Sequence, residues 1–121
     1  MPDHPEAFEH MLAAWNEADP EKIRGHLEKA LADGVDFCDP QHHVQGLDAF
    51  ETMVRNFRRD IPAARCLRTS GLDAHHDRVR YHWVVQDGDT PLLEGMDVTT
   101  VDADGRVLRV DGFFGAPPAA D

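Results

Sequence analysis

Residues 94–115, EGMDVTTVDADGRVLRVDGFFG, read as two β-strands joined by a tight turn. The turn is DADG at residues 102–105, where aspartates bond to nearby backbone and Gly105 supplies the positive φ that closes the turn. The strand-forming residues after it are Val107, Leu108, Val110, Phe113 and Phe114. This stretch therefore predicts an antiparallel hairpin.

One residue of the hairpin, Asp97, differs from its apolar neighbours. Side chains alternate across a strand, so Asp97 shares a face with Gly95, Thr99 and Val101. That face is either solvated, as is usual for a carboxylate, or directed into a cavity lined by apolar neighbours. The hairpin pattern alone leaves both interpretations open.

The composition excludes several classes of partner. The chain has 121 residues, which suits one domain with one core, and it carries 12 basic against 23 acidic residues. Nucleic-acid binding normally needs a basic patch, and the short run of Arg55, Arg58 and Arg59 is typical of a solvated helix surface. An acidic chain is also a poor partner for anionic membranes. We expect no nucleic-acid and no membrane partner.

Location is predicted from three features. No apolar run approaches the roughly 20 residues that cross a bilayer. The first ten residues, MPDHPEAFEH, lack the basic and apolar regions of a signal peptide. Cys38 and Cys66 have no metal or redox spacing, and each is typical of a small buried hydrophobe. We expect a cytoplasmic protein.

The first half of the chain predicts three helices. The helix at residues 5–18 has an apolar stripe at i, i+3, i+4 and i+7 spacing. Asp19-Pro20 is an N-cap followed by a first-turn proline, and Gly34 suits the position after the last turn of the second helix. A short strand at residues 35–38 and an extended segment at 41–45 follow, and a third helix runs from Gly46 to Pro62. The stripe of the first helix consists of Phe8, Met11, Leu12 and Trp15.

The second half of the chain predicts strands at residues 64–70, 78–86, 92–101 and 106–114, with turns at 71–77, 87–89 and 102–105. Helices followed by an antiparallel meander make an α+β layout. We expect a cone, in which a curved antiparallel sheet wraps three N-terminal helices around a cavity. Residues 1–115 should form a single domain, followed by a disordered tail at residues 116–121.

Six short motifs carry a family resemblance over about residues 5–115. They are WNEADP at 15–20, FCDP at 37–40, Gly46, GMD at 95–97, DGR at 104–106 and GFFG at 112–115. In this order and spacing they resemble the nuclear transport factor 2-like superfamily, also called SnoaL-like or ketosteroid-isomerase-like. That superfamily holds isomerases, cyclases, dehydratases, epoxide hydrolases and proteins that only bind or dimerise, so function must be argued from the site.

The resemblance to the isomerases implies roles for two aspartates. Those enzymes place a general-base aspartate in the Asp-Pro step and a second, protonated aspartate on the strand before the last hairpin. Asp39 and Asp97 match these positions, which implies that Asp97 faces a cavity. The tyrosine that the isomerases carry in the first helix matches Met11, which donates no hydrogen bond. This departure favours a related reaction, or a binding role, over steroid isomerisation.

The residues themselves allow a functional and a structural interpretation at each position. Asp39 is either a general base or the residue that starts a turn before Pro40. Asp97 is either a neutral acid that donates to a developing oxyanion, or a polar residue satisfied by backbone or a histidine. His42 and His43 point opposite ways in an extended chain, so at most one faces inward. The inward histidine would polarise Asp39 or bind ligand. We place His43 in the candidate pocket.

The orientation of residues 79–85 is also open. Val79, Tyr81, Trp83 and Val85 share one face, and Arg80, His82 and Val84 share the other. Alignment with the isomerases without a gap points Arg80 and His82 at the cavity, whereas a one-residue bulge points Tyr81 and Trp83 inward.

These observations lead to one functional hypothesis. We expect a SnoaL-like enzyme that uses acid-base proton transfer on a small apolar substrate with a carbonyl group, with Asp39 as base and Asp97 as acid or oxyanion donor. The alternative is a binding or dimerisation module of the same fold. We expect no cofactor and no metal. We also expect a homodimer that forms through the outer face of the sheet. Besides the two aspartates, the candidate pocket residues are Met11, Trp15, His43, Phe57, Arg80, His82, Trp83 and Phe114.

Overall fold

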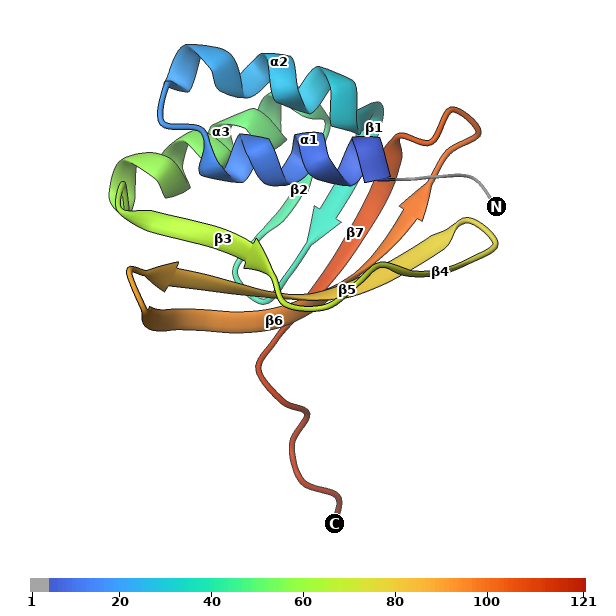
Figure 1. The fold of residues 1–121 in the computed structure, drawn as a ribbon. Helices are drawn as coiled ribbons and strands as arrows, with labels where there is room; N and C mark the ends of the chain where they lie inside the picture. The colour runs from blue at the N-terminus through green and yellow to red at the C-terminus, as the bar shows by residue number, and fades with distance from the viewer. Residues whose placement is uncertain (1–4) are drawn as a thin grey trace.

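A computed structural model describes residues 5–121 and shows two layers, with three helices covering one face of a curved seven-stranded sheet (Figure 1). The α+β cone expected from the sequence is confirmed. The strand order is β2-β1-β7-β6-β5-β3, and β4 pairs with β5 beside this path. The helices are α1 Pro5–Asn16, α2 Pro20–Ala30 and α3 Leu47–Asp60. The strands are β1 Leu31–Cys38, β2 His43–Gln45, β3 Ala64–Arg68, β4 Asp73–His75, β5 Arg78–Asp87, β6 Thr90–Val101 and β7 Val107–Phe114.

Helix α2 begins as the sequence predicts and ends earlier. The Asp19 carboxylate accepts a hydrogen bond from the Glu21 backbone N–H at 3.0 Å, which caps the first turn. At the other end Leu31 adopts an extended backbone and pairs with Val107 of β7. The expected helix end at Gly34 is therefore wrong, because pairing with a distant strand overrides the local helical pattern.

The sheet is mixed rather than antiparallel throughout. Strand β1 runs parallel to β7, with Phe37 opposite Val110, and all other neighbouring strands are antiparallel. Residues 73–75, expected to be part of a turn, form the short strand β4 against β5. The β1–β7 pair joins the first third of the chain to its last strand and brings the Asp-Pro step beside the last hairpin.

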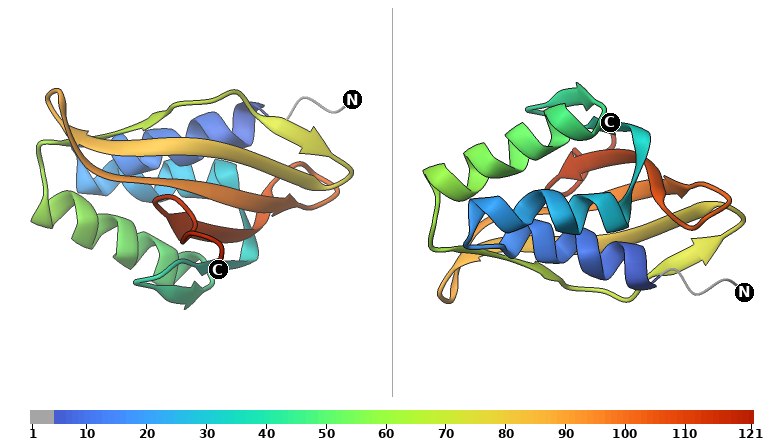
Figure 2. Two further views of the ribbon diagram at one scale, coloured as in Figure 1. Left: turned by 90° about the horizontal axis from the view of Figure 1, so that it is seen from below. Right: turned by 90° about the horizontal axis from the view of Figure 1, so that it is seen from above.

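The core lies between the helices and the covered face of the sheet. Within residues 5–121, Figure 2 shows no helix on the other face. The largest fully buried side chains of the core include Phe8, Ile23, Leu27, Phe50 and Val110. Burial of such side chains contributes about 1.5–3 kcal/mol each. Among residues 5–121, no helix has the length and apolarity needed to cross a membrane.

The end of α1 is tied to the edge strand β3 by one side chain. The Asn16 amide donates to the Cys66 carbonyl at 2.9 Å and accepts from the Cys66 N–H at 2.8 Å. The amide thus satisfies backbone groups that an edge strand leaves unpaired. This contact fixes the spacing between α1 and β3, which form one wall of a cavity.

Candidate functional site

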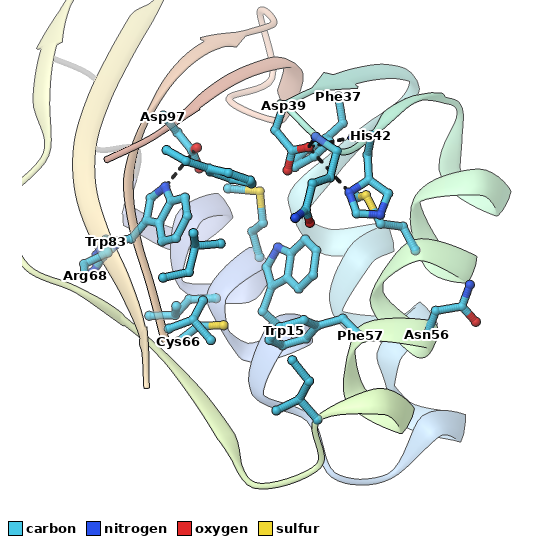
Figure 3. Close-up of a pocket in the computed structure, with 18 of the residues that line it drawn as sticks. Trp15, Phe37, Asp39, His42, Asn56, Phe57, Cys66, Arg68, Trp83 and Asp97 are labelled. Atoms are coloured by element: carbon cyan, nitrogen blue, oxygen red, sulfur yellow. Dashed lines mark hydrogen bonds and ion pairs between the residues drawn. The ribbon is translucent and has the colours of Figure 1, made fainter. Parts of the chain in front are cut away.

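A cavity of about 360 Å³ lies between the helices and the concave face of the sheet (Figure 3). Side chains from α1, α3, β1, β3, β5, β6 and β7 line it, most of them aromatic or aliphatic. Five of the expected pocket residues are among them: Met11, Trp15, Phe57, Trp83 and Phe114. A cavity of this size and lining suits a small apolar ligand.

Trp15 and Phe57 are half-buried, as expected of residues that face a cavity rather than a closed core. Their rings meet edge to face, with centroids 5.2 Å apart and planes at 81°. Aromatic rings prefer this arrangement, which holds both side chains in place. The cavity therefore has a preformed aromatic wall where α1 and α3 meet.

Asp97 directs its carboxylate into the cavity and accepts two hydrogen bonds there. Trp83 Nε1 donates to Oδ1 at 3.0 Å, and the Tyr81 hydroxyl donates to Oδ2 at 3.0 Å. Both donors lie on β5, where Tyr81 is the direct cross-strand partner of Asp97. The strand register therefore brings one acceptor and two donors together on the concave face.

The apolar surroundings perturb the acidity of Asp97. Desolvation raises its pKa from the usual value near 4 to about 6, against the opposing effect of the hydrogen bonds from Trp83 and Tyr81. The neighbouring charge of Asp39 raises it further. Asp97 is therefore mostly ionised at pH 7 when the cavity is empty, whereas we expected it to be protonated near neutral pH.

Asp39 starts a turn and also lines the cavity, so the turn interpretation is confirmed and the role as a general base stays a prediction. Its Oδ1 accepts hydrogen bonds from the backbone N–H groups of Gln41 and His42, each at 2.8 Å. The same oxygen lies 3.4 Å from His42 Nδ1. These contacts orient the carboxylate at the end of β1, where the side chain is largely shielded from water.

Gly112 has no side chain, which leaves room beside the cavity for the side chains of Asp97 and Asp39. It is the β7 partner of Asp97 in the sheet. A Cβ atom at Gly112 would lie 2.9 Å from Asp97 Oδ1 and 3.2 Å from Asp39 Cβ. Any side chain at this position would therefore press on both aspartates. Sequence reasoning placed Gly112 in a motif and missed this role.

Gly95 has a similar relation to Trp83, its partner on β5. A Cβ atom at Gly95 would overlap the indole ring, so the ring lies directly against the Gly95 backbone. The rings of Trp83 and Phe114 meet edge to face, with centroids 5.9 Å apart and planes at 88°. These two neighbours hold the indole N–H in line with Asp97.

Three of the expected pocket residues lie outside the cavity. His43 is exposed, and its Nε2 lies 3.2 Å from Asp36 Oδ1. Arg80 donates to Asp73 of β4 at 2.8 Å, and His82 is exposed on the outer sheet face. The expectation is wrong for these three, because the face of β5 that carries Tyr81 and Trp83 lies under the helices.

The lining residues that were not predicted to be pocket residues by the sequence include Tyr81, His42, Cys66 and Arg68. The alternation in β5, which groups Tyr81 with Trp83, was the available signal for the first. Burial raises the pKa of the Cys66 thiol to about 11, which makes it a poor nucleophile at neutral pH. Arg68 forms an ion pair with Glu9 of α1. In the described part of the chain, no three His, Cys, Asp or Glu side chains are grouped as a metal site would require.

Comparison with known families identifies the fold family. The sequence profile of the SnoaL-like domain matches residues 8–110, which is most of the chain. The chain belongs to the SnoaL-like family. No curated protein matches its sequence.

Several solved structures share this fold, and they differ in what is stated of their function. A proposed isomerase of the SnoaL-like family from Agrobacterium tumefaciens is 28% identical, with a TM-score of 0.85, over 93% of this chain and 97% of that one. A SnoaL-like protein of unknown function from Burkholderia thailandensis is 20% identical, with a TM-score of 0.69, over 90% and 92% of the two chains. A de novo designed protein with a curved β-sheet is 15% identical, with a TM-score of 0.70, over 93% and 84%. These structures show the fold, and function has to be argued from the site.

Proposed function

We propose that this SnoaL-like protein is an enzyme that moves a proton on a small apolar substrate carrying a carbonyl group. One observation carries the proposal, namely that a desolvated carboxyl, Asp97, faces the same apolar cavity as a second carboxyl, Asp39. Carboxyl groups whose environments differ in this way are suited to separate acid and base roles.

In the proposed reaction, the Asp39 carboxylate removes a proton from the carbon next to the substrate carbonyl. The electron pair of that C–H bond moves to the carbonyl oxygen and forms an enolate. The hydrogen-bonded group that contains neutral Asp97 stabilises this oxygen by donating a hydrogen bond to it. The proton held by Asp39 then returns to a carbon of the substrate, so the product is an isomer and no cofactor is consumed.

Ligand binding itself favours the protonation state that this reaction needs. An apolar ligand would displace water from the cavity and desolvate Asp97 further. The same binding would therefore raise the Asp97 pKa above its value of about 6 in the empty site. The neutral acid is thus formed when substrate is present, because burying a carboxylate in an apolar site is costly.

The test is deuterium exchange at the carbon beside the carbonyl of α-tetralone, an apolar bicyclic ketone, followed by NMR in heavy water. We expect the wild type to accelerate exchange and Asp39→Asn to reduce this acceleration by roughly 10²–10⁴-fold. Asp36→Asn is the matched control, since Asp36 lies on β1 three residues before Asp39 and contacts His43 outside the cavity. Equal exchange with Asp39→Asn and wild type would refute the proposed base.

A second candidate function is ligand binding without catalysis, and Met11 is the observation that favours it. Met11 is buried in the cavity wall at the position where the isomerases carry a tyrosine donor. A protein that binds α-tetralone and leaves its exchange rate unchanged would be a binding module.

A further inference from the structure

Tyr81 differs from Trp83 in the hydrogen bonds it can make to Asp97. The indole N–H of Trp83 is only a donor, so Oδ1 of Asp97 must remain an acceptor in every protonation state. The Tyr81 hydroxyl is both donor and acceptor, and it contacts Oδ2. When Asp97 takes up a proton, the arrangement that keeps the Trp83 hydrogen bond places that proton on Oδ2.

A proton on Oδ2 reverses the hydrogen bond to Tyr81. Asp97 then donates to the Tyr81 oxygen, and the phenolic hydrogen of Tyr81 is released to another acceptor. Tyr81 lines the cavity and is otherwise buried, with 6% of its surface exposed. The available acceptor is therefore a ligand in the cavity.

We propose that Tyr81, rather than Asp97 itself, donates the hydrogen bond to the carbonyl oxygen of the ligand, and that protonation of Asp97 releases it to do so. This inference rests on the proposed function for its ligand class. It also supplies the donor that the isomerase pattern places at Met11, from a different element of the fold, β5 instead of α1.

The charged groups around Tyr81 are compatible with this role. Asp97 approaches it from β6, Arg68 from β3 and, beyond Asp97, Asp39 from the end of β1. The lining residues of α1 beside it, such as Phe8, are apolar, and the Phe8 ring meets Tyr81 edge to face at 5.7 Å. Burial and the nearby Asp97 raise the pKa of the Tyr81 phenol, so the hydroxyl keeps its proton throughout the working range.

The experiment measures the infrared carbonyl stretch of bound α-tetralone, isotope-labelled at its carbonyl carbon. Spectra are taken at about pH 5 and about pH 9, on either side of the Asp97 pKa of about 6. A hydrogen bond lowers the stretching frequency. For the wild type we expect the low-frequency band at the acidic pH and its loss at the basic pH.

Two variants separate Tyr81 from Asp97. In Asp97→Asn the amide oxygen accepts from Trp83 and the amide N–H₂ donates to Tyr81, so the low-frequency band should be present at both pH values. In Tyr81→Phe the band should be lost at both, while the ketone still binds through the ring contacts. Melting curves of both variants check that they fold.

Three results would overturn the inference. They are a low-frequency band that survives in Tyr81→Phe, a band missing from Asp97→Asn at both pH values, and a wild-type protein that does not bind the ketone. The second would make the Asp97 hydroxyl the direct donor and leave the proposed reaction intact. Conversely, the expected bands without deuterium exchange would refute the reaction and leave the donor assignment standing.

Discussion

At the scale of single residues, the site depends on the contrast between two aspartates. Asp39 is held by backbone N–H groups at the end of a strand, whereas Asp97 is surrounded by aromatic rings and accepts only from Tyr81 and Trp83. Backbone donors stabilise a carboxylate, and an apolar cavity destabilises one. The two side chains therefore lie in different environments although they belong to the same residue type.

The raised pKa of Asp97 makes stability depend on pH. Because its folded-state pKa of about 6 exceeds the unfolded value of about 4, the folded protein binds this proton more tightly than the unfolded chain does. The contribution of Asp97 to the free energy of unfolding therefore decreases as pH rises from about 4 to about 6 and is constant above that range. The decrease attributable to Asp97 is roughly 3 kcal/mol.

Asp97→Asn should remove this dependence, since an amide does not titrate and still bonds to Trp83 and Tyr81. We expect the variant to be as stable as the wild type or more stable at pH 7, with a flatter melting temperature between about pH 4 and pH 6.5. Thermal unfolding across this range is the measurement. A variant markedly less stable at pH 7 would show that the fold stabilises the ionised form of Asp97, which contradicts its raised pKa.

At the scale of elements, glycines on the two long strands make room for the site. Gly112 of β7 faces Asp97 and Asp39, and Gly95 of β6 faces Trp83. A strand interior normally disfavours glycine, because glycine has no side chain to pack and loses more backbone entropy than other residues. Here the missing side chain allows neighbouring side chains to approach the backbone.

Gly112→Ala should displace Asp97, because the new Cβ would lie 2.9 Å from Oδ1. We expect a loss of about 1–3 kcal/mol in the free energy of unfolding, typical of overpacking, together with an altered pH dependence of the melting temperature. Gly34→Ala is the matched control, since Gly34 lies in β1 with open space around it. Similar stabilities of the two variants would show that the space at Gly112 is not needed.

At the scale of the whole molecule, the uncovered sheet face carries apolar side chains. Phe113 of β7 is 61% exposed, and further large exposed hydrophobics on strands β3, β6 and β7 are Leu67, Leu92 and Leu108. Exposed apolar residues on one uncovered sheet often mark an interface between proteins. We propose that two copies of the chain associate through this face, as the sequence led us to expect.

Light scattering at micromolar concentration should give the mass of a dimer. Phe113→Glu should give a monomer, because a carboxylate in the centre of an apolar interface would be desolvated without a partner. Ile61→Glu is the control, since Ile61 is similarly apolar and exposed but lies at the mouth of the cavity. A monomer mass for the wild type, or a dimer of the Phe113 variant, would contradict the proposed interface.

Several features of this protein are determined locally and can be predicted from the sequence. The turn at residues 102–105 follows from Asp and Gly preferences, and α1 and α3 follow from apolar stripes that include Trp15 and Phe57. The alternation along β5 correctly grouped Tyr81 with Trp83. Asp39 and Asp97 were found through family motifs, whose order along the chain is also visible without a structure.

Other features were decided only by contacts between distant segments. The end of α2 at Ala30 depends on Leu31 pairing with β7, and the inward face of β5 depends on which side the helices cover. A strand pattern defines two faces without saying which is buried, so Arg80 and His82 were expected in the pocket. The space at Gly112 exists only because three strands place Asp97, Gly112 and Asp39 side by side. Burial and register are properties of the assembled sheet, and they set the acidity of Asp97.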